Sequence, residues 1–261
     1  MRINNVKALW STGSAAINGW LHNPSSWSAE LMAHQGYDSL TVDLEHGLLD
    51  YQAAVPMLQA ISTTSVVPLA RVPWNEPGII MRMLDAGAYG IICPMIESAE
   101  DCQRFVGACR YHPHGYRSLG PTRAKLYGGA DYEQHANEHI LTFAMIETGK
   151  AVQDIDRIVA VPGLDAVYVG PGDLSLSMGL KKRLDNDEPE FLAALDTILA
   201  ACGRSGVMPA IHTNDPSYAT EMIARGFRLV TVMTDSTMLA AMARQTVGIV
   251  RGAMVKNGSA R

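Results

Sequence analysis

The chain has 261 residues, 48% of them hydrophobic, which suits either one large barrel or two ordinary domains. A formal net charge of -5 argues against nucleic acid as a partner, because phosphate binding needs a basic face. We expect neither a membrane span nor a signal peptide, because no segment approaches roughly 20 consecutive apolar residues and no long apolar run follows a basic start. The four cysteines lack the paired spacing of a structural zinc site and suit a reducing cytoplasm.

Short apolar runs alternate along the chain with longer helical patterns. In chain order the expected strands are Ala15–Trp20, Leu40–Asp43, Val66–Arg71, Gly90–Pro94, Leu141–Ile146, Ala166–Val169, Val207–Ile211 and Leu229–Val232. The helices expected to follow them are Ser25–His34, Gln52–Ile61, Pro77–Ala86, Ala99–Cys109, Ala151–Ala160, Glu190–Arg204, Tyr218–Ala224 and Met238–Val250. Eight strand–helix units are the number that closes a parallel barrel. The sequence therefore predicts an α/β protein with a single (β/α)₈ barrel (TIM barrel) over residues 1–261, and a long irregular loop over Tyr111–Glu138.

Polar side chains stand where several of these strands end. Asp43 and His46 follow the second strand, Arg71 ends the third, Glu147 follows the fifth and Asp173 follows the sixth. In such barrels the active site lies at the C-terminal ends of the strands. The sequence therefore predicts that these side chains converge on one rim.

Each of these residues has a chemical interpretation and a structural one. Glu147 and Asp173 suit Mg²⁺ or Mn²⁺, or are carboxylates bound to backbone amides. Arg71 offers a planar fork for a substrate carboxylate, or forms a salt bridge to one of these acids. His46 is a candidate general base that Asp43, three residues earlier, would orient.

Two further groups complete the candidate site. The backbone N–H groups of Gly172 and Asp173 are expected to face a bound carboxylate, and Trp20, at the end of the first strand, is a candidate substrate contact. None of the six lysines falls within an expected strand. A Schiff-base mechanism needs a buried amine, so the sequence argues against one.

Five segments in the order of the expected barrel strands form a characteristic set: Val42–Gly47, Arg71–Pro73, Leu84–Pro94, Met145–Thr148 and Val169–Ser175. Together they resemble the HpcH/HpaI aldolase family, and the resemblance spans about Ala15 to Val250. It implies a metal-dependent class II aldolase in which Glu147 and Asp173 bind a divalent metal ion (Mg²⁺, Mn²⁺ or Co²⁺). It also implies that Arg71 holds the pyruvyl carboxylate and stabilises the enolate, and that His46, paired with Asp43, is the acid–base group.

The resemblance has further implications outside the metal site. Arg117 and Arg123 would match a basic loop near the substrate mouth. The assembly would be a homo-oligomer, a hexamer built as a trimer of dimers, with the last helix packed on a neighbouring subunit. Met145 stands where family members that cleave the heptanedioate often carry Gln, which leaves the substrate open.

Two alternatives remain at this point. A lyase acting on a CoA thioester, related to the citrate lyase β subunit, would use similar carboxylates but needs a basic surface for the CoA pyrophosphate. No such cluster is obvious in the sequence. A barrel that only binds an oxo acid would keep Arg71 but would not need His46 or the metal pair.

Overall fold

The computed structural model describes residues 1–258, and within them eight parallel strands form a closed barrel in the order β1 to β8. The strands are β1 (Ala16–Leu21), β2 (Ser39–Asp43), β3 (Val67–Arg71), β4 (Gly90–Cys93), β5 (Leu141–Ile146), β6 (Ala166–Val169), β7 (Met208–Thr213) and β8 (Leu229–Val232). Closure comes from the pairing of β1 with β8, in which Ala16 lies opposite Leu229. The predicted (β/α)₈ barrel is confirmed.

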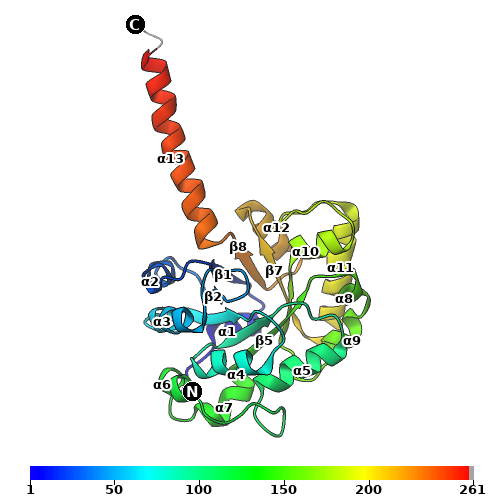
Figure 1. Cartoon of the computed structure of the whole chain (residues 1–261). Coiled ribbons are helices and arrows are strands. Elements are labelled where there is room, and N and C mark those ends of the chain that lie inside the picture. The colour runs from blue at the N-terminus through cyan, green and yellow to red at the C-terminus, as the bar shows by residue number, and fades with distance from the viewer. Residues whose placement is uncertain (259–261) are drawn as a thin grey trace.

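Helices surround this barrel (Figure 1). They are α2 (Ser26–Ala33), α3 (Tyr51–Ile61), α4 (Pro77–Asp85), α5 (Ala99–Cys109), α6 (Thr122–Gly128), α7 (Tyr132–His139), α8 (Gly149–Gln153), α9 (Ile155–Val159), α10 (Pro171–Ser177), α11 (Pro189–Ser205) and α12 (Pro216–Arg225). A short helix before the first strand, α1 (Asn5–Ser11), lies at the N-terminal end of the barrel, where the Trp10 indole N–H donates to the carbonyl of Arg228 (2.7 Å).

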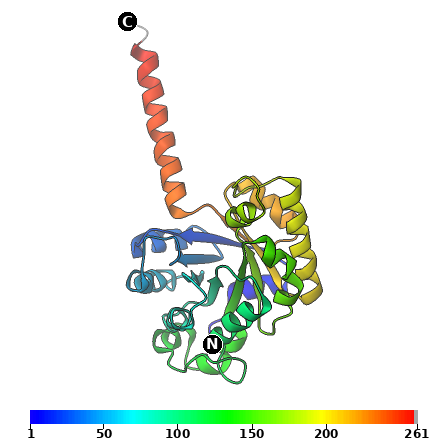
Figure 2. The same ribbon diagram turned by 45° about the vertical axis from the view of Figure 1, so that its right-hand side comes forward.

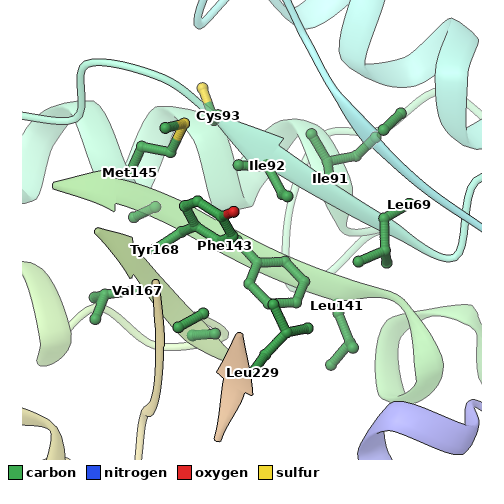
Figure 3. Packing of buried hydrophobic residues seen from close by; sticks show 14 of the residues in the cluster. Leu69, Ile91, Ile92, Cys93, Leu141, Phe143, Met145, Val167, Tyr168 and Leu229 are labelled. Atoms are coloured by element: carbon green, nitrogen blue, oxygen red, sulfur yellow. The ribbon is translucent and has the colours of Figure 1, made fainter. Parts of the chain in front are cut away.

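Most of the barrel wall is buried on both faces. Every residue of β2, β3, β4, β5 and β6 is buried, as expected of strands that are covered by helices outside and by side chains inside. Figure 3 shows part of this packing, in which Leu69, Ile91 and Leu141 come from three successive strands. A rigid wall of this kind fixes the positions of the side chains at its rim.

Glycines end helices at the expected places. Gly206 follows α11 with φ +75°, in the left-handed region that closes a helix without a Cβ penalty. Gly36, Gly87 and Gly226 also have positive φ in the corresponding positions of other units. These four turns direct the chain from a helix into the next strand.

Two sequence expectations need correction. The stretch Tyr111–Glu138 is not one irregular loop, because it contains α6 and most of α7. The single helix expected over Ala151–Ala160 is two short helices that meet at Asp154.

The last helix, α13 (Asp235–Gly258), departs from the barrel and points away from it (Figures 1 and 2). Its exposed apolar side chains include Leu239, Met242, Ile249 and Val250. Within residues 1–258, no helix is long and apolar enough to cross a membrane.

Candidate active site

A pocket of about 560 Å³ opens at the C-terminal ends of the strands. Among its lining residues are six of the residues that the sequence singled out: Trp20, His46, Arg71, Glu147, Gly172 and Asp173. They come from five separate strand–helix units, so barrel closure is what brings them together.

Asp43 is the centre of the polar network beneath the pocket. Its buried carboxylate accepts hydrogen bonds from Arg71 Nε (2.8 Å), Arg71 Nη2 (2.5 Å) and the Trp20 indole N–H (3.0 Å), and His22 Nε2 lies 2.9 Å from it. Burial by itself would raise the pKa of the Asp43 carboxyl, but the hydrogen bonds from His22, Arg71 and Trp20 outweigh burial and leave that pKa well below its ordinary value. Asp43 is therefore a fixed negative charge.

Arg71 binds Asp43 with one side of its guanidinium, through Nε and Nη2. Its Nη1 lies 2.8 Å from Glu45 Oε2, and its Cζ lies 4.9 Å from the centre of the Trp20 ring. The side chain is nearly buried but lines the pocket. The edge formed by Nη1 and Nη2 is thus the part of the fork left for a substrate.

Glu45 is a carboxylate whose hydrogen bonding is incomplete. Although Oε2 lies close to Arg71 Nη1, the N–H groups do not point at it, and this buried oxygen has no hydrogen-bond partner. Burial raises the pKa of Glu45 to about 6 against the opposing charge of Arg71, and the charges of Asp43 and Asp173 also favour its protonated form. Such an atom is costly to bury unless something else binds it.

Glu147 is held by the backbone around it. The N–H of Met95 donates to its Oε2 (2.9 Å), and Met95 adopts φ 53°, a left-handed conformation unusual for a residue with a side chain. Gly170 packs so closely that a Cβ there would lie 2.7 Å from Glu147 Oε1. Burial raises the pKa of Glu147 to about 7, and the Glu45 and Asp173 charges add to this effect. The carboxylate is positioned and makes no salt bridge within the described residues, although the charge of Arg71 partly opposes the rise in its pKa.

Gly172 and Asp173 occupy the first turn of α10. This helix has no side-chain N-cap, since Gly170 takes that position. The Asp173 side chain lines the pocket from an exposed position, whereas Gly172 is buried. Both residues lie where the sequence placed them.

The comparisons with known proteins agree with this geometry. The model of the family "HpcH/HpaI aldolase/citrate lyase" matches residues 18–241. The chain belongs to the HpcH/HpaI aldolase/citrate lyase family. A hydroxypyruvate/pyruvate aldolase of Rhizorhabdus wittichii is 37% identical to it over 249 residues, which cover 95% of this chain and 99% of the relative.

Two other relatives support the same assignment. A 4-hydroxy-2-oxo-heptane-1,7-dioate aldolase of Escherichia coli is 35% identical over 240 residues, or 91% of each chain. The crystal structure of an HpcH/HpaI aldolase/citrate lyase family protein from Burkholderia cenocepacia has a TM-score of 0.88 at 33% identity, covering 95% of this chain and 99% of that one. The chain is therefore an enzyme of the aldolase type, a carbon–carbon lyase.

The expected pairing of Asp43 with the His46 ring is not found in this family member. Asp43 Oδ1 accepts from the backbone N–H of His46 (3.4 Å), while the ring nitrogen Nε2 lies 4.0 Å from Glu45 Oε1 and its side chain is 64% exposed. The ring that contacts Asp43 is that of His22, which follows β1. Spacing in sequence suggested the wrong histidine because residues three apart in a turn need not direct their side chains at each other.

The expected position of Arg117 and Arg123 at the substrate mouth is wrong for this barrel. Arg117 is buried and donates to Asp85 Oδ1 (2.7 Å) and the Tyr132 hydroxyl (3.1 Å). Arg123 donates to the Ala86 carbonyl (2.6 Å) at the end of α4. Helices in this fold end at the N-terminal side of the strands, so both arginines lie at the opposite end from the pocket.

Sequence reasoning missed four residues of this site, of which His22, Tyr168 and His212 line the pocket. Glu45 and His22 complete the charged network, whereas Tyr168 and His212 form part of the wall. His22 and His212 stand at strand ends, and that placement was the signal that could have found them. Glu45 adjoins the His46 phrase and carried no separate signal.

One lysine also lies at the pocket. Lys182 lines it from the segment after α10, but the residue is exposed and thus lacks the desolvation that activates a Schiff-base amine. Sodium borohydride added together with pyruvate is expected to leave the intact mass unchanged, as in a control with borohydride alone. A reduced pyruvyl adduct on Lys182 would instead establish a Schiff base and overturn a metal-dependent mechanism.

Proposed function

We propose that the enzyme is a divalent-metal-dependent class II aldolase that reversibly cleaves 4-hydroxy-2-oxo acids into pyruvate, or another 2-oxo acid, and an aldehyde. The observation that carries this proposal is the excess of carboxylates around the pocket. The charge of Asp173 raises the pKa of Glu45 and of Glu147, the charge of Glu45 also raises the pKa of Glu147, and the charge of Arg71 opposes both effects. The names of the relatives from R. wittichii and E. coli support the substrate class.

The donor set fits a hard divalent cation. Residues 1–258 contain no group of three or more His, Cys, Asp or Glu side chains arranged as a complete metal cage. Mg²⁺ and Mn²⁺ commonly bind one or two carboxylates and complete their shells with water and substrate oxygens. Glu147 and Asp173 would hold the cation, and its positive charge would oppose the burial and the repulsion from Glu45 and Asp173 that raise the pKa of Glu147. A bound cation would act as a Lewis acid toward the 2-oxo group of the substrate.

The protein groups around the pocket would do the rest of the chemistry. His46, exposed at the mouth, would take the proton of the 4-hydroxyl as the C3–C4 bond breaks and the aldehyde forms. The electron pair of that bond passes to the oxo acid as an enolate, which gains a proton at C3 from His46 or from a solvent water. The outer edge of Arg71 would hold the carboxylate and offset the enolate charge, while Asp43 and His22 keep the guanidinium oriented.

A panel of 4-hydroxy-2-oxo acids tests this function. Release of pyruvate is expected with added Mg²⁺, Mn²⁺ or Co²⁺, and not after treatment with EDTA. Full activity in EDTA would contradict the proposal.

A CoA-thioester lyase is the second candidate, and one observation bears on it. Lys182 at the pocket is preceded by Lys181 and followed by Arg183, which together form a short basic run. Arg183 is already paired with Asp187 (3.1 Å). Cleavage of an acyl-CoA, rather than of a 4-hydroxy-2-oxo acid, would favour this candidate.

The pH dependence of metal binding follows from Glu147. Its pKa of about 7, above the ordinary 4.5, means that the metal-free folded protein keeps a proton that the unfolded chain loses. This group's contribution to stability therefore falls as pH rises from about 4.5 to 7, and a cation replaces the proton above that range.

Mn²⁺ is expected to raise the melting temperature more at pH 8 than at pH 6, as scanning fluorimetry would show. Glu147→Gln serves as the control that loses this pH dependence, and an equal rise at both pH values in the parent enzyme would contradict the prediction.

We also propose that α13 packs on a neighbouring copy in a homo-oligomer, with a hexamer as the expected state. On α13, Leu239, Met242 and Ile249 are 62–68% exposed, and on β1 the side chain of Ile17 is 44% exposed although it belongs to the barrel wall. If α13 of a second copy packed over Ile17, the apolar surfaces of α13 and of β1 would both be removed from water. Sedimentation of Leu239→Glu/Met242→Glu beside the parent protein tests this, because a change to a smaller species is expected.

The cytoplasm is the location that we propose. All four cysteines are free and buried, which suits a reducing compartment.

A further inference from the structure

His212 lies in the pocket wall and has no part in the chemistry proposed above. It belongs to β7, and the edge of its ring meets the Trp20 indole at 5.1 Å between ring centres. Its Nδ1 lies 3.2 Å from the Tyr168 hydroxyl. The ring is packed between two aromatic side chains, so its orientation is fixed.

The neighbouring hydrogen bonds decide which nitrogen carries the proton. The Tyr168 hydroxyl has one hydrogen, and it donates that hydrogen to Thr231 Oγ1 (2.7 Å). Thr231 Oγ1 also accepts from Asn18 Nδ2 (2.8 Å). The tyrosine oxygen can therefore only accept from His212, which places the imidazole proton on Nδ1.

His212 is neutral in this position. Burial lowers the pKa of His212 to about 3, and the nearby positive charge of Arg71 acts in the same direction. With its one proton on Nδ1, the ring presents Nε2 as an unprotonated acceptor. No donor within residues 1–258 makes a hydrogen bond to Nε2. Nε2 is also not one of the polar atoms that are both fully buried and without a hydrogen-bond partner, so a ligand in the pocket can reach it.

Three other residues near His212 in the pocket, Trp20, Tyr168 and Met145, offer no comparable group. The Trp20 N–H is committed to Asp43, the Tyr168 hydroxyl to Thr231, and Met145 has no polar hydrogen. On this part of the pocket wall Nε2 is thus the acceptor without a donor in the described residues, while charged side chains such as Arg71 and Glu147 line other parts. An acceptor in such a place favours a ligand that brings a donor and disfavours a ligand of the same shape that lacks one.

We propose that His212 Nε2 accepts a hydrogen bond from a substrate hydroxyl and makes the enzyme selective for a hydroxylated reactant. The inference rests on the aldol function proposed above and narrows its substrate class. The hydroxyl belongs either to C3 of the 2-oxo acid, as in hydroxypyruvate, or to the carbon beside the aldehyde group, as in glycolaldehyde. His212 is a specificity residue in this proposal, because it moves no proton in the reaction.

The test measures kcat/KM for carbon–carbon bond formation with four reactant pairs. Pyruvate and hydroxypyruvate are each combined with acetaldehyde and glycolaldehyde, in the presence of Mn²⁺. The parent enzyme is expected to prefer the hydroxylated form of one reactant, either hydroxypyruvate over pyruvate or glycolaldehyde over acetaldehyde. His212→Leu is expected to reduce that preference roughly 10- to 100-fold, mainly by slowing the hydroxylated partner. Which preference changes identifies the source of the hydroxyl.

Two controls separate selectivity from a structural effect. Tyr168→Phe removes the acceptor of Nδ1–H and lets the proton move to Nε2, so it should lower the preference while retaining the imidazole. In the parent enzyme the preference should be constant from pH 6 to 9, because a neutral ring does not titrate there.

Three outcomes would overturn the inference. They are an unchanged preference in His212→Leu, an equal loss for all four pairs, and a preference that falls as pH drops toward 6. A parent enzyme that joins none of the four pairs would instead contradict the aldol function, and the inference would fall with it.

Discussion

Asp173→Ala is expected to abolish metal-dependent cleavage while leaving the fold intact. The side chain is exposed in the pocket and makes no structural hydrogen bond within the described residues, so its loss should not lower the melting temperature appreciably. Removing one of two protein ligands should weaken metal binding by at least about 100-fold, since even outer-shell changes typically weaken it 10- to 100-fold. Calorimetric titration with Mn²⁺ measures the affinity, and pyruvate release measures the activity.

Glu147→Gln provides a second test of the same pair. The amide keeps the volume beside Gly170 and the contact with the Met95 N–H, but it removes the charge that a cation would bind. Activity should fall to the level of Asp173→Ala. Asp187→Asn is the matched control, because Asp187 is an exposed acid paired with Arg183 at the surface. Normal Mn²⁺ affinity in both pocket variants would refute the assignment of the metal ligands.

Replacement of Arg71 should have the other large effect, and it should act on both stability and catalysis. Arg71→Ala leaves Asp43 buried without its bidentate partner, and breaking a buried ion pair in this way typically costs about 3–5 kcal/mol of folding stability. The variant also loses the group that would hold the substrate carboxylate. We expect kcat/KM of the folded fraction to fall on the order of 10³-fold, which corresponds to a loss of several kcal/mol of transition-state stabilisation.

Arg71→Lys distinguishes the two effects. An ammonium keeps the charge near Asp43, so much of the folding stability should return. It cannot donate hydrogen bonds to Asp43 in the bidentate geometry and to a substrate carboxylate at the same time. The loss in kcat/KM should therefore persist. The control is Arg110→Lys, which alters another buried arginine–carboxylate pair, with Asp165 (2.7 Å), outside the pocket. Near-normal kcat/KM in Arg71→Lys would show that Arg71 serves only to hold Asp43.

The sequence alone determined the barrel and the main contents of its rim. Apolar runs such as Val67–Arg71 can be covered on both faces only in a parallel sheet with helices outside, and glycines such as Gly206 mark where each helix turns back. Once eight such units close, residues at strand ends must meet at one rim. For that reason the sequence alone predicts that Arg71, Glu147 and Asp173 lie together, as they do in the pocket.

The tertiary structure alone decided which side chains touch. Asp43 contacts His22, from the neighbouring strand unit, and not the nearby His46 ring, because the turn after β2 directs that ring to solvent. Arg117 and Arg123 lie at the N-terminal end of the barrel, where they bind Asp85 and the carbonyl of Ala86. The order of residues in the sequence does not reveal at which end of the barrel this segment lies. The proton on His212 depends on Tyr168 and Thr231, which belong to the two strands that flank β7. Contacts of this kind arise between segments far apart in the chain, and only barrel closure sets their distances.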